Sequence, residues 1–436
     1  MTVLTVALLV AAASATAWAD QVRVNVAVDK PVLLANKKQT AYLRVGLTGF
    51  AMSDVTKRTP ANVAIVLDKS GSMQGEKIAR AKEAAIMAID RLRQDDIVSV
   101  VTYDSTVHVL VPATKVSNRV EIHAAINRLQ AGGSTALFAG VSKGASEVRK
   151  FLERNRVNRV ILLSDGIANV GPSSPGDLAE LGSSLIREGI SVTTIGLGLD
   201  YNEDLMTQLA RKSDGNHMFA ETATDLAEAF DREFGDVLAV VAQDVTVTIR
   251  CAKGVRPVRV LGREADIAGQ TVTATLNQLY SDQMKYVLLE VELPPGRAGR
   301  ELRVASVDVS YANMGTKTTD RLGSTVSVRF TDLPSLVEAN TNRDVMVAAA
   351  HQIGVATNQV AVRLRDEGKI EEARQKLISN LNFLSQEAAK YDSDVLKEYA
   401  DFNQIDAQNL DDTNWKRQRK SMREVQHRIQ GQQVEK

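Results

Sequence analysis

The sequence predicts an α/β protein in which a doubly wound, mostly parallel sheet is inserted into a β-sandwich and is followed by a C-terminal helical region. Three observations predict this fold class. Short apolar runs alternate with helical patterns between residues 61 and 240, which is typical of a parallel sheet covered on both faces. Strand-like patterns lie on both sides of that unit, at 21–56 and 243–330. Residues 334–436 carry mainly helical patterns.

The composition is that of a soluble globular chain long enough for two or three domains. The 436 residues are 44% hydrophobic and 24% charged. Lys plus Arg and Asp plus Glu number 53 each, and this balance argues against a nucleic-acid-binding protein, which should show a basic excess. Cys251 is the only cysteine, so it forms no internal disulfide, and we expect it to be a small core residue.

The N-terminus has the pattern of a secretory signal peptide, residues 1–19. Residues 3–17 are apolar and alanine-rich, and Ala17-Trp18-Ala19 forms a cleavage site before Asp20. The first residues contain no Lys or Arg, so the start codon could lie elsewhere, the signal could be atypical, or the segment could be a membrane anchor. We expect an exported protein, periplasmic or at the cell surface or secreted, with no stable membrane span after processing. Export without disulfides suits a bacterial protein.

The expected elements run in a regular order along the chain. Two alternating segments come first, Val22–Val28 and Ala41–Leu47. The strands expected in the α/β unit are Val63–Leu67, Ile97–Thr102, Val160–Leu163 and Val192–Leu197. The helices expected between and after them are Glu76–Arg91, Arg119–Leu129, Phe138–Glu153, Asp177–Glu188, Glu203–Arg211 and Leu226–Leu238.

Strand patterns return after the α/β unit and suggest that this unit is an insertion. The expected strands are Asp244–Arg250, Thr271–Leu276, Tyr286–Leu293, Leu302–Tyr311 and Gly323–Phe330. The N-terminal strands would then complete a sandwich with these later ones. The predicted domain limits are 20–57 for the N-terminal strands, 58–240 for the α/β domain, 241–332 for the rest of the sandwich and 333–436 for the helical region.

The helical region contains a helical hairpin followed by a charged segment. Helices over Val345–Glu367 and Ile370–Lys390 are joined by the tight connection Glu367-Gly368-Lys369. The segment Lys416–Arg423 is charged and has no clear apolar face, so the sequence predicts a solvated or partly disordered tail there.

Three loops of the α/β unit carry oxygen ligands suited to a hard cation. Asp68-Lys69-Ser70-Gly71-Ser72 follows the first apolar strand, and Ser164-Asp165-Gly166 follows a later one. Gly132-Gly133-Ser134-Thr135 precedes a helix. Ligands bind at the carboxyl ends of parallel strands where the strand order reverses, so we expect the three loops to meet. Two carboxylates and three hydroxyls suit Mg²⁺.

This combination resembles a von Willebrand factor type A domain with the metal-ion-dependent adhesion site of that family. The match is firm over about residues 60–240 and loose over the flanking strands, whose arrangement resembles inter-α-trypsin inhibitor heavy chains and calcium-activated chloride channel homologues. The resemblance implies that one Mg²⁺, or Mn²⁺ or Ca²⁺, binds at the adhesion site. At least one coordination position of the metal would stay open to a partner's carboxylate. The implied metal residues are Asp68, Ser70, Ser72, Thr135 and Asp165. Without metal, the two carboxylates should repel each other.

We therefore expect a non-catalytic, divalent-cation-dependent protein-binding module for adhesion or assembly, whose protein partner offers an acidic residue. The alternatives are a structural envelope protein whose metal only braces the loops, or an unrecognised hydrolase. The five histidines show no zinc-binding pattern, and no nucleophile elbow or phosphate-binding glycine motif occurs. Ser70 or Ser72 as a nucleophile has no evident base nearby in the sequence. His217 lies in a segment that reads as an edge strand, where a structural role is favoured.

Overall fold

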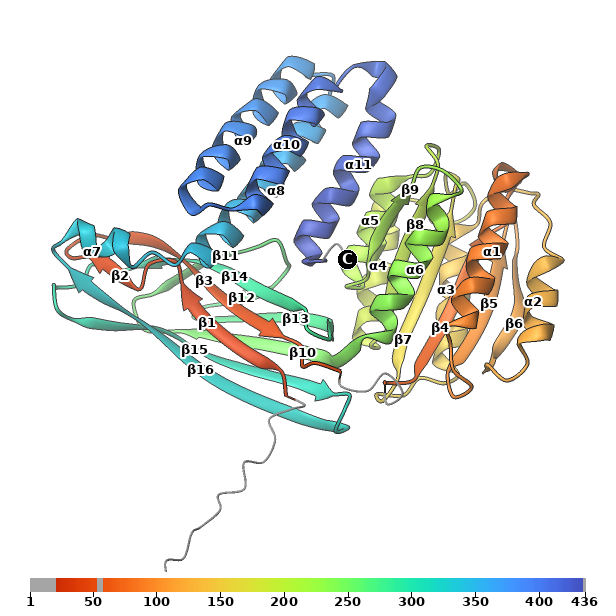
Figure 1. The fold of residues 1–436 in the computed structure, drawn as a ribbon, viewed down its shortest axis with the longest axis horizontal. Helices are drawn as coiled ribbons and strands as arrows, with labels where there is room; N and C mark the ends of the chain where they lie inside the picture. Colours follow the sequence, from red (N-terminus) through yellow and green to blue (C-terminus); the bar gives the residue numbers. More distant parts are fainter. Residues whose placement is uncertain (1–20, 53–57, 434–436) are drawn as a thin grey trace, which may run out of the picture.

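The computed structural model describes residues 21–52 and 58–433, which fold into an α/β unit, a β-sandwich and a helical region (Figure 1). The α/β unit is inserted into the sandwich, because strands before and after this unit belong to the sandwich. The helical region follows the last strand of the sandwich. The predicted signal peptide lies outside the described residues.

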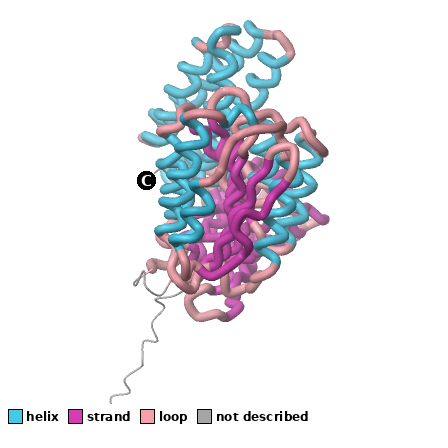
Figure 2. Tube along the Cα trace, turned by 90° about the vertical axis from the view of Figure 1, so that its right-hand side faces the viewer, coloured by secondary structure: helices cyan, strands magenta, loops and turns pink. Residues whose placement is uncertain are grey.

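The α/β unit is a six-stranded sheet with helices on both sides, as Figure 2 shows. The strand order is β6-β5-β4-β7-β8-β9, and all pairs are parallel except β5 with β6. The strands are β4 (Ala61–Asp68), β5 (Ile97–Tyr103), β6 (Val107–Lys115), β7 (Val157–Ser164), β8 (Ser191–Leu197) and β9 (His217–Ala220). The helices are α1 (Glu76–Asp90), α2 (Arg119–Asn127), α3 (Leu137–Arg149), α4 (Pro175–Arg187), α5 (Glu203–Lys212) and α6 (Asp225–Leu238).

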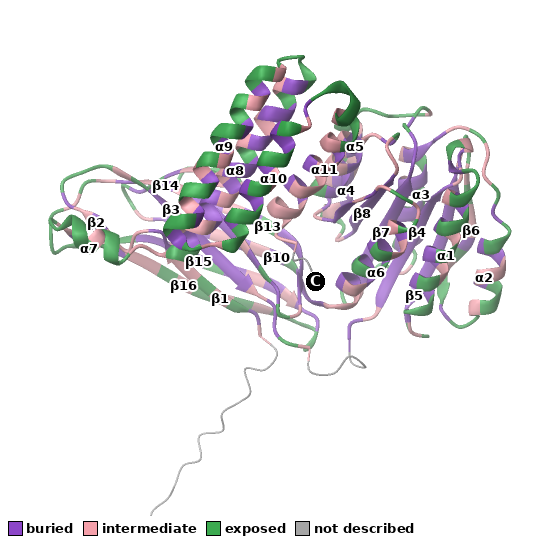
Figure 3. Ribbon diagram, turned by 45° about the horizontal axis from the view of Figure 1, so that its top comes forward, coloured by how far each residue is buried: buried purple, intermediate pink, exposed green. Residues whose placement is uncertain are grey.

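The central strand β4 explains why the sheet must be covered on both faces. All its residues are buried, and successive side chains point to opposite sides. Val63 and Ile65 pack in the core beneath α1 and α6, whereas Ala64 and Val66 pack against α3, α4 and α5. A strand without polar alternation therefore needs a covering layer on each face, and the helices supply both layers. Figure 3 shows these strands as the buried centre of the unit.

The β-sandwich combines strands from both flanks of the α/β unit. One sheet has the order β1-β3-β14-β11 and the other β12-β13-β10-β15-β16-β2. In the first sheet, β3 pairs antiparallel with β14, from Gln39 opposite Leu293 to Thr48 opposite Met284. Cys251 is buried in the core between the sheets, as the sequence predicts. The strands are β1 (Arg23–Val28), β2 (Val32–Leu34), β3 (Gln39–Thr48), β10 (Val240–Cys251), β11 (Arg256–Leu261), β12 (Asp266–Ala268), β13 (Thr271–Tyr280), β14 (Met284–Leu293), β15 (Glu301–Asn313) and β16 (Thr318–Thr331).

The helical region stands on the sandwich and leans against the α/β unit (Figure 1). The predicted hairpin is α8 and α9, and Gly368 between them adopts a positive φ of 79°, which suits glycine at the end of a helix. The first turns of α8 pack on the sandwich through Val345, Ala348 and Ala349. The helices are α7 (Pro334–Ala339), α8 (Arg343–Asp366), α9 (Ile370–Tyr391), α10 (Asp394–Gln408) and α11 (Asp412–Gly431).

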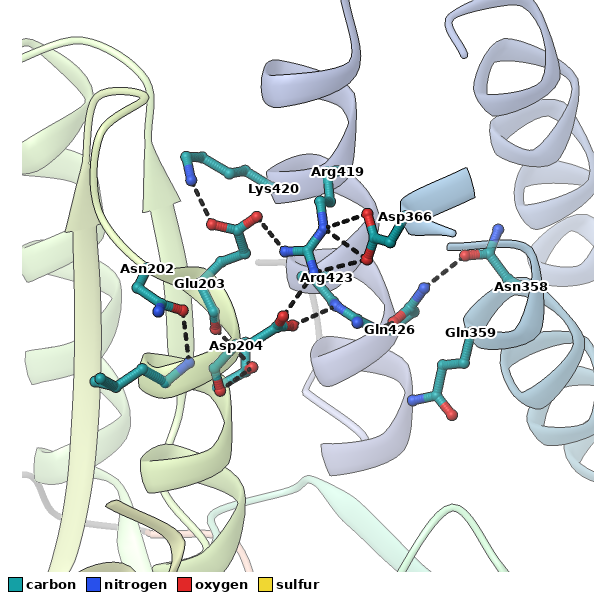
Figure 4. A network of polar contacts seen from close by, with 12 residues as sticks. Asn202, Glu203, Asp204, Asn358, Gln359, Asp366, Arg419, Lys420, Arg423 and Gln426 are labelled. Atoms are coloured by element: carbon teal, nitrogen blue, oxygen red, sulfur yellow. Dashed lines mark hydrogen bonds and ion pairs between the residues drawn. The ribbon is translucent and has the colours of Figure 1, made fainter. Parts of the chain in front are cut away.

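The expectation of a solvated or partly disordered tail around Lys416–Arg423 is wrong. This segment lies in the middle of α11, which fills the space between α8 and the α/β unit. Arg419 and Arg423 of this segment pair with acidic side chains of α5 and α8 (Figure 4). Lys420 is only 2% exposed. The charge pairs of α11 add to apolar contacts, since Trp415 and Met422 join one hydrophobic cluster of the helical region and Val425 and Ile429 join another.

One helix of the described chain, α8, is long and apolar enough to cross a membrane by length and composition alone. More than half of its apolar window is buried among its neighbours, as in the core helix of a helical bundle. The expectation of no stable membrane span after processing stays a prediction.

The predicted fold class is confirmed: a mostly parallel α/β unit lies within a β-sandwich, and a helical region follows. The prediction omits the edge strand β6, whose residues are mostly exposed or half-buried. The domain limits given above stay a prediction.

Candidate metal site

The strand order places two acidic residues beside each other at the carboxyl ends of the two central strands. This end of the sheet is called its edge below, as distinct from the edge strands β6 and β9. Asp68 is the last residue of β4, and Asp165 follows the last residue of β7. These two strands are parallel neighbours, and the order reverses between them, since β5 lies on one side of β4 and β7 on the other. The edge therefore is the switch point at which parallel sheets bind ligands.

Backbone hydrogen bonds tie the three loops of the site together. Gly71 N donates to Gly133 O at 3.0 Å, which joins the first loop to the second. Thr135 N donates to Asn169 Oδ1 at 2.8 Å, and Asn169 N donates back to Thr135 O at 3.1 Å. The second loop is thereby joined to the loop after β7. The position of each functional side chain thus depends on all three loops.

The side chains themselves form a connected set. Ser72 Oγ donates to Asp165 Oδ1 at 2.6 Å, and the hydroxyls of Ser70 and Ser72 lie 3.1 Å apart. Asp68 Oδ1 accepts from Ser70 N at 2.8 Å, so its position is fixed by the loop that it begins. These contacts link four of the five residues that the sequence singles out.

Gly166 shows that the fifth residue, Thr135, belongs to the same group. A Cβ atom on Gly166 would stand 3.2 Å from Thr135 Oγ1, 3.4 Å from Ser72 Oγ and 3.9 Å from Ser70 Oγ. The three hydroxyls therefore surround one small space that the missing side chain of this glycine leaves open. All five residues meet at one edge of the sheet.

Burying the two carboxylates costs free energy unless hydrogen bonds or positive charges compensate their negative charge. Asp68 and Asp165 are both fully buried. Burial raises the pKa of Asp68 above its usual value, while hydrogen bonds from Ser70 and Ser164 lower it in part. Ser164 Oγ donates to Asp68 Oδ2 at 2.7 Å. Ser164 is not among the residues predicted from the sequence, although it lies directly before Asp165.

Lys77 is the residue that sequence reasoning missed. It lies in the first turn of α1, and its Nζ donates to Asp165 Oδ2 at 2.6 Å. The expected repulsion between two unrelieved carboxylates is therefore partly offset. The only sequence signal is that Lys77 lies at the start of the helix that follows the first loop. That signal could not show which side of α1 faces the site.

The donor set fits a hard, oxygen-binding cation. Among the described residues, no three His, Cys, Asp or Glu side chains gather in a way that could hold a metal ion. The site supplies two carboxylates and completes the set with neutral hydroxyls, which is the ligand class that Mg²⁺ accepts, together with waters. The space beside Gly166 lies among those hydroxyls. Metal binding by these residues remains a prediction.

The serines and His217 show no nucleophilic arrangement. In the described part of the chain, the side-chain hydrogen bonds of Ser70 and Ser72 reach each other and nearby carboxylates, and none reaches an imidazole. His217 lies in the edge strand β9, where its Nδ1 is 2.8 Å from Thr194 Oγ1. Burial lowers the pKa of His217 well below its usual value, so it packs as a neutral ring. Its environment is that of a core residue.

The family model of the von Willebrand factor type A domain matches residues 62–232, which contain the sheet, its helices and the site. The chain is 29% identical over 279 residues to the uncharacterized protein sll0103 of Synechocystis, an alignment covering 62% of this chain and 65% of that protein. It is 30% identical over 179 residues to human inter-alpha-trypsin inhibitor heavy chain H3, covering 39% and 20% respectively. The chain thus spans less than two thirds of either relative.

A solved structure shares almost the whole fold. The von Willebrand factor type A protein from Catenulispora acidiphila superposes with a TM-score of 0.72 over 88% of this chain and 89% of its own, at 19% identity. The likeness extends beyond the α/β unit, so the sandwich and helical region belong to a fold that also occurs elsewhere.

Proposed function

Because residues 62–232 form a von Willebrand factor type A domain, we propose that this chain is a divalent-cation-dependent protein-binding module. Domains of this family are typically protein-interaction modules. The observation that carries the proposal is the convergence of two buried carboxylates and three hydroxyls around the space beside Gly166. The module would serve adhesion or assembly rather than catalysis.

The metal would be held by Asp68, Ser70, Ser72, Thr135 and Asp165. Mg²⁺ is the first choice because the donors are hard oxygens, with Mn²⁺ or Ca²⁺ as substitutes. The two carboxylates supply negative charge, and the hydroxyls supply neutral donors without adding charge. A bound cation would provide a positive centre for an oxygen ligand from outside the chain.

An acidic side chain of a protein partner is the natural external ligand. A carboxylate oxygen is hard and charged, so it binds a hard cation more strongly than a neutral group does. Ser72 is exposed, which leaves the site accessible from solvent. Ile167, two residues beyond Asp165, is 62% exposed and would offer an apolar contact beside that carboxylate.

Calorimetric titration of Mg²⁺ into the wild-type chain and the Asp68→Ala and Asp165→Ala variants tests the proposal. The wild type should bind one ion, and each variant should bind at least about tenfold more weakly, because a dication then faces a single carboxylate. Equal affinity of the three proteins would refute the site assignment.

A capture experiment with the same proteins separates a metal that binds a partner from a metal that only braces the loops. Capture of a protein partner from an envelope extract, with Mg²⁺ or with EDTA, should be lost in EDTA and in the Asp165→Ala variant. If Mg²⁺ raised the melting temperature of the wild type but no capture depended on it, the metal would only brace the loops.

We also propose that the chain is exported to the periplasm or cell surface. The support is the signal-peptide pattern of residues 1–19 with its Ala17-Trp18-Ala19 site. The mature protein should begin at Asp20, which the intact mass of the chain recovered from its native host would show. An unprocessed chain retained in the membrane fraction would contradict this.

A further inference from the structure

Lys77 shares the carboxylate that a metal ion in the candidate site would need. The Nζ atom lies 2.6 Å from Asp165 Oδ2, and the other oxygen of this carboxylate accepts from Ser72. The Asp165 side chain is fully buried, whereas that of Lys77 is 31% exposed. A buried carboxylate needs a charge partner, and in the described residues this ammonium group is the one that contacts it.

The neighbouring lysine does not share this role. Lys69 lies inside the first loop, but its Nζ pairs with Asp104 at the end of β5. Lys77 reaches the site from a different element, because it lies in the first turn of α1. A Cβ atom built on Gly198 would lie 3.6 Å from Lys77 Nζ, so the ammonium group stands between Asp165 and the end of β8.

The net charge of the site changes with each bound species. The two carboxylates and Lys77 together carry one negative charge. A bound dication would change this to one positive charge, and a partner's carboxylate would then bring the site to neutrality. Without Lys77, the dication and the two carboxylates would already be neutral, and nothing in the local charge would favour an acidic partner.

We propose that Lys77 is a tethered counter-cation that holds Asp165 in the metal-free protein, weakens binding of the metal alone and favours metal binding together with an acidic ligand. This inference rests on the proposed function of the site. It names Lys77 as a residue that determines ligand preference, although the metal is not expected to touch it. Its partly exposed side chain can turn into solvent when Asp165 binds another cation.

The test is titration of Mg²⁺ into the wild type, Lys77→Met and Lys77→Arg, with and without acetate as a carboxylate probe. Lys77→Met should bind Mg²⁺ at least about tenfold more tightly than the wild type, because a repelling charge is gone. Acetate should strengthen Mg²⁺ binding in the wild type and in Lys77→Arg, and have little effect in Lys77→Met.

Lys82→Met is the matched control. Lys82 lies on the same helix, and its Nζ donates to the backbone oxygen of Asn127 at 3.1 Å, away from the site. This variant should bind Mg²⁺ with wild-type affinity. A comparable gain in Lys82→Met would show that a general change in charge, and not Lys77, is responsible.

Thermal melting gives a second readout. In EDTA, Lys77→Met should melt below the wild type, because Asp165 loses its partner. In saturating Mg²⁺ it should melt at or above the wild type. A merely structural lysine would lower the melting temperature in both conditions.

The possible outcomes distinguish this inference from the proposed function. If the wild type binds Mg²⁺ and Lys77→Met binds it equally or more weakly, the role of Lys77 is overturned while the site stands. If only Lys77→Met binds detectably, the counter-cation role is supported. If neither protein binds Mg²⁺, both proposals fail.

Discussion

Two acidic clusters of this molecule differ in how their charge is balanced. At the carboxyl ends of β4 and β7, Asp68 and Asp165 are fully buried, and among the described residues their ammonium partner is Lys77. Where α11 meets α5 and the end of α8, three carboxylates face three cations (Figure 4). The interface residues are Glu203, Asp204, Asp366, Arg419, Lys420 and Arg423.

The balanced cluster holds parts of the fold together, whereas the unbalanced one would take up an external cation under the proposed function. Arg419 alone joins three elements, since its guanidinium group pairs with Glu203 and Asp204 of α5 and with Asp366 of α8. Every charge there has a partner within the chain. At the sheet edge the chain leaves one negative charge uncompensated, a cost that is understandable if an external cation completes the site.

The largest expected effect on stability is that of Arg419→Ala. Removing the guanidinium group leaves three carboxylates with reduced compensation in a mostly buried place, since the Arg419 side chain is 17% exposed. We expect a loss of about 3 kcal/mol in the free energy of unfolding. Urea denaturation followed by the fluorescence of Trp415, which lies on the same helix, measures this loss.

Arg417→Ala is the control for that variant. Arg417 pairs with Glu221 but is 62% exposed, so its removal should cost about 0.5 kcal/mol or less. Equal losses in the two variants would mean that α11 is held by its total charge rather than by the buried cluster.

A smaller effect on stability and a larger one on binding are expected for Gly166→Ala. The added methyl group would stand 3.2 Å from Thr135 Oγ1 and occupy part of the space among the hydroxyls. The backbone at Gly166 has no positive φ, so we expect a change of less than about 1 kcal/mol in unfolding. The affinity for Mg²⁺ should fall about tenfold or more, as calorimetry would show.

Gly132→Ala is the matched control within the site's own loops. A Cβ atom there would have open space around it, and the backbone has no positive φ. Its affinity for Mg²⁺ and its stability should match those of the wild type. A variant of Gly166 that binds normally but unfolds easily would assign this edge of the sheet a structural role instead.

The parallel sheet and the candidate residues could be predicted because their signals are local. The run Val63–Leu67 has no polar position, which predicts a strand covered on both faces, and β4 is such a strand. The order of the three loops along the chain follows from the topology of a doubly wound sheet. Consequently Asp68 and Asp165 were expected at one edge, and they are found there.

The place of α11 could not be predicted because its partners are distant in the chain. The segment Lys416–Arg423 is dominated by charge, and the acidic residues that pair with Arg419 belong to α5 and the end of α8. Likewise, the contact of Lys77 with Asp165 depends on how α1 is rotated against β7. Patterns within one segment do not contain such information.

The insertion of the α/β unit also has a consequence for the order in which the chain can fold. Strand β3 can pair with β1 early, but its other side stays unpaired until β14 has been made, since Thr48 lies opposite Met284. Ser281 contacts the chain on both sides of the insertion, because its Oγ accepts from Met52 N and its N donates to Ala239 O. Once the α/β unit has folded, its two ends lie together, and the entropy of closing the long loop has already been lost. During synthesis the inserted α/β unit is therefore expected to fold before the sandwich is complete. The N-terminal strands are made first but are among the last to reach their final positions.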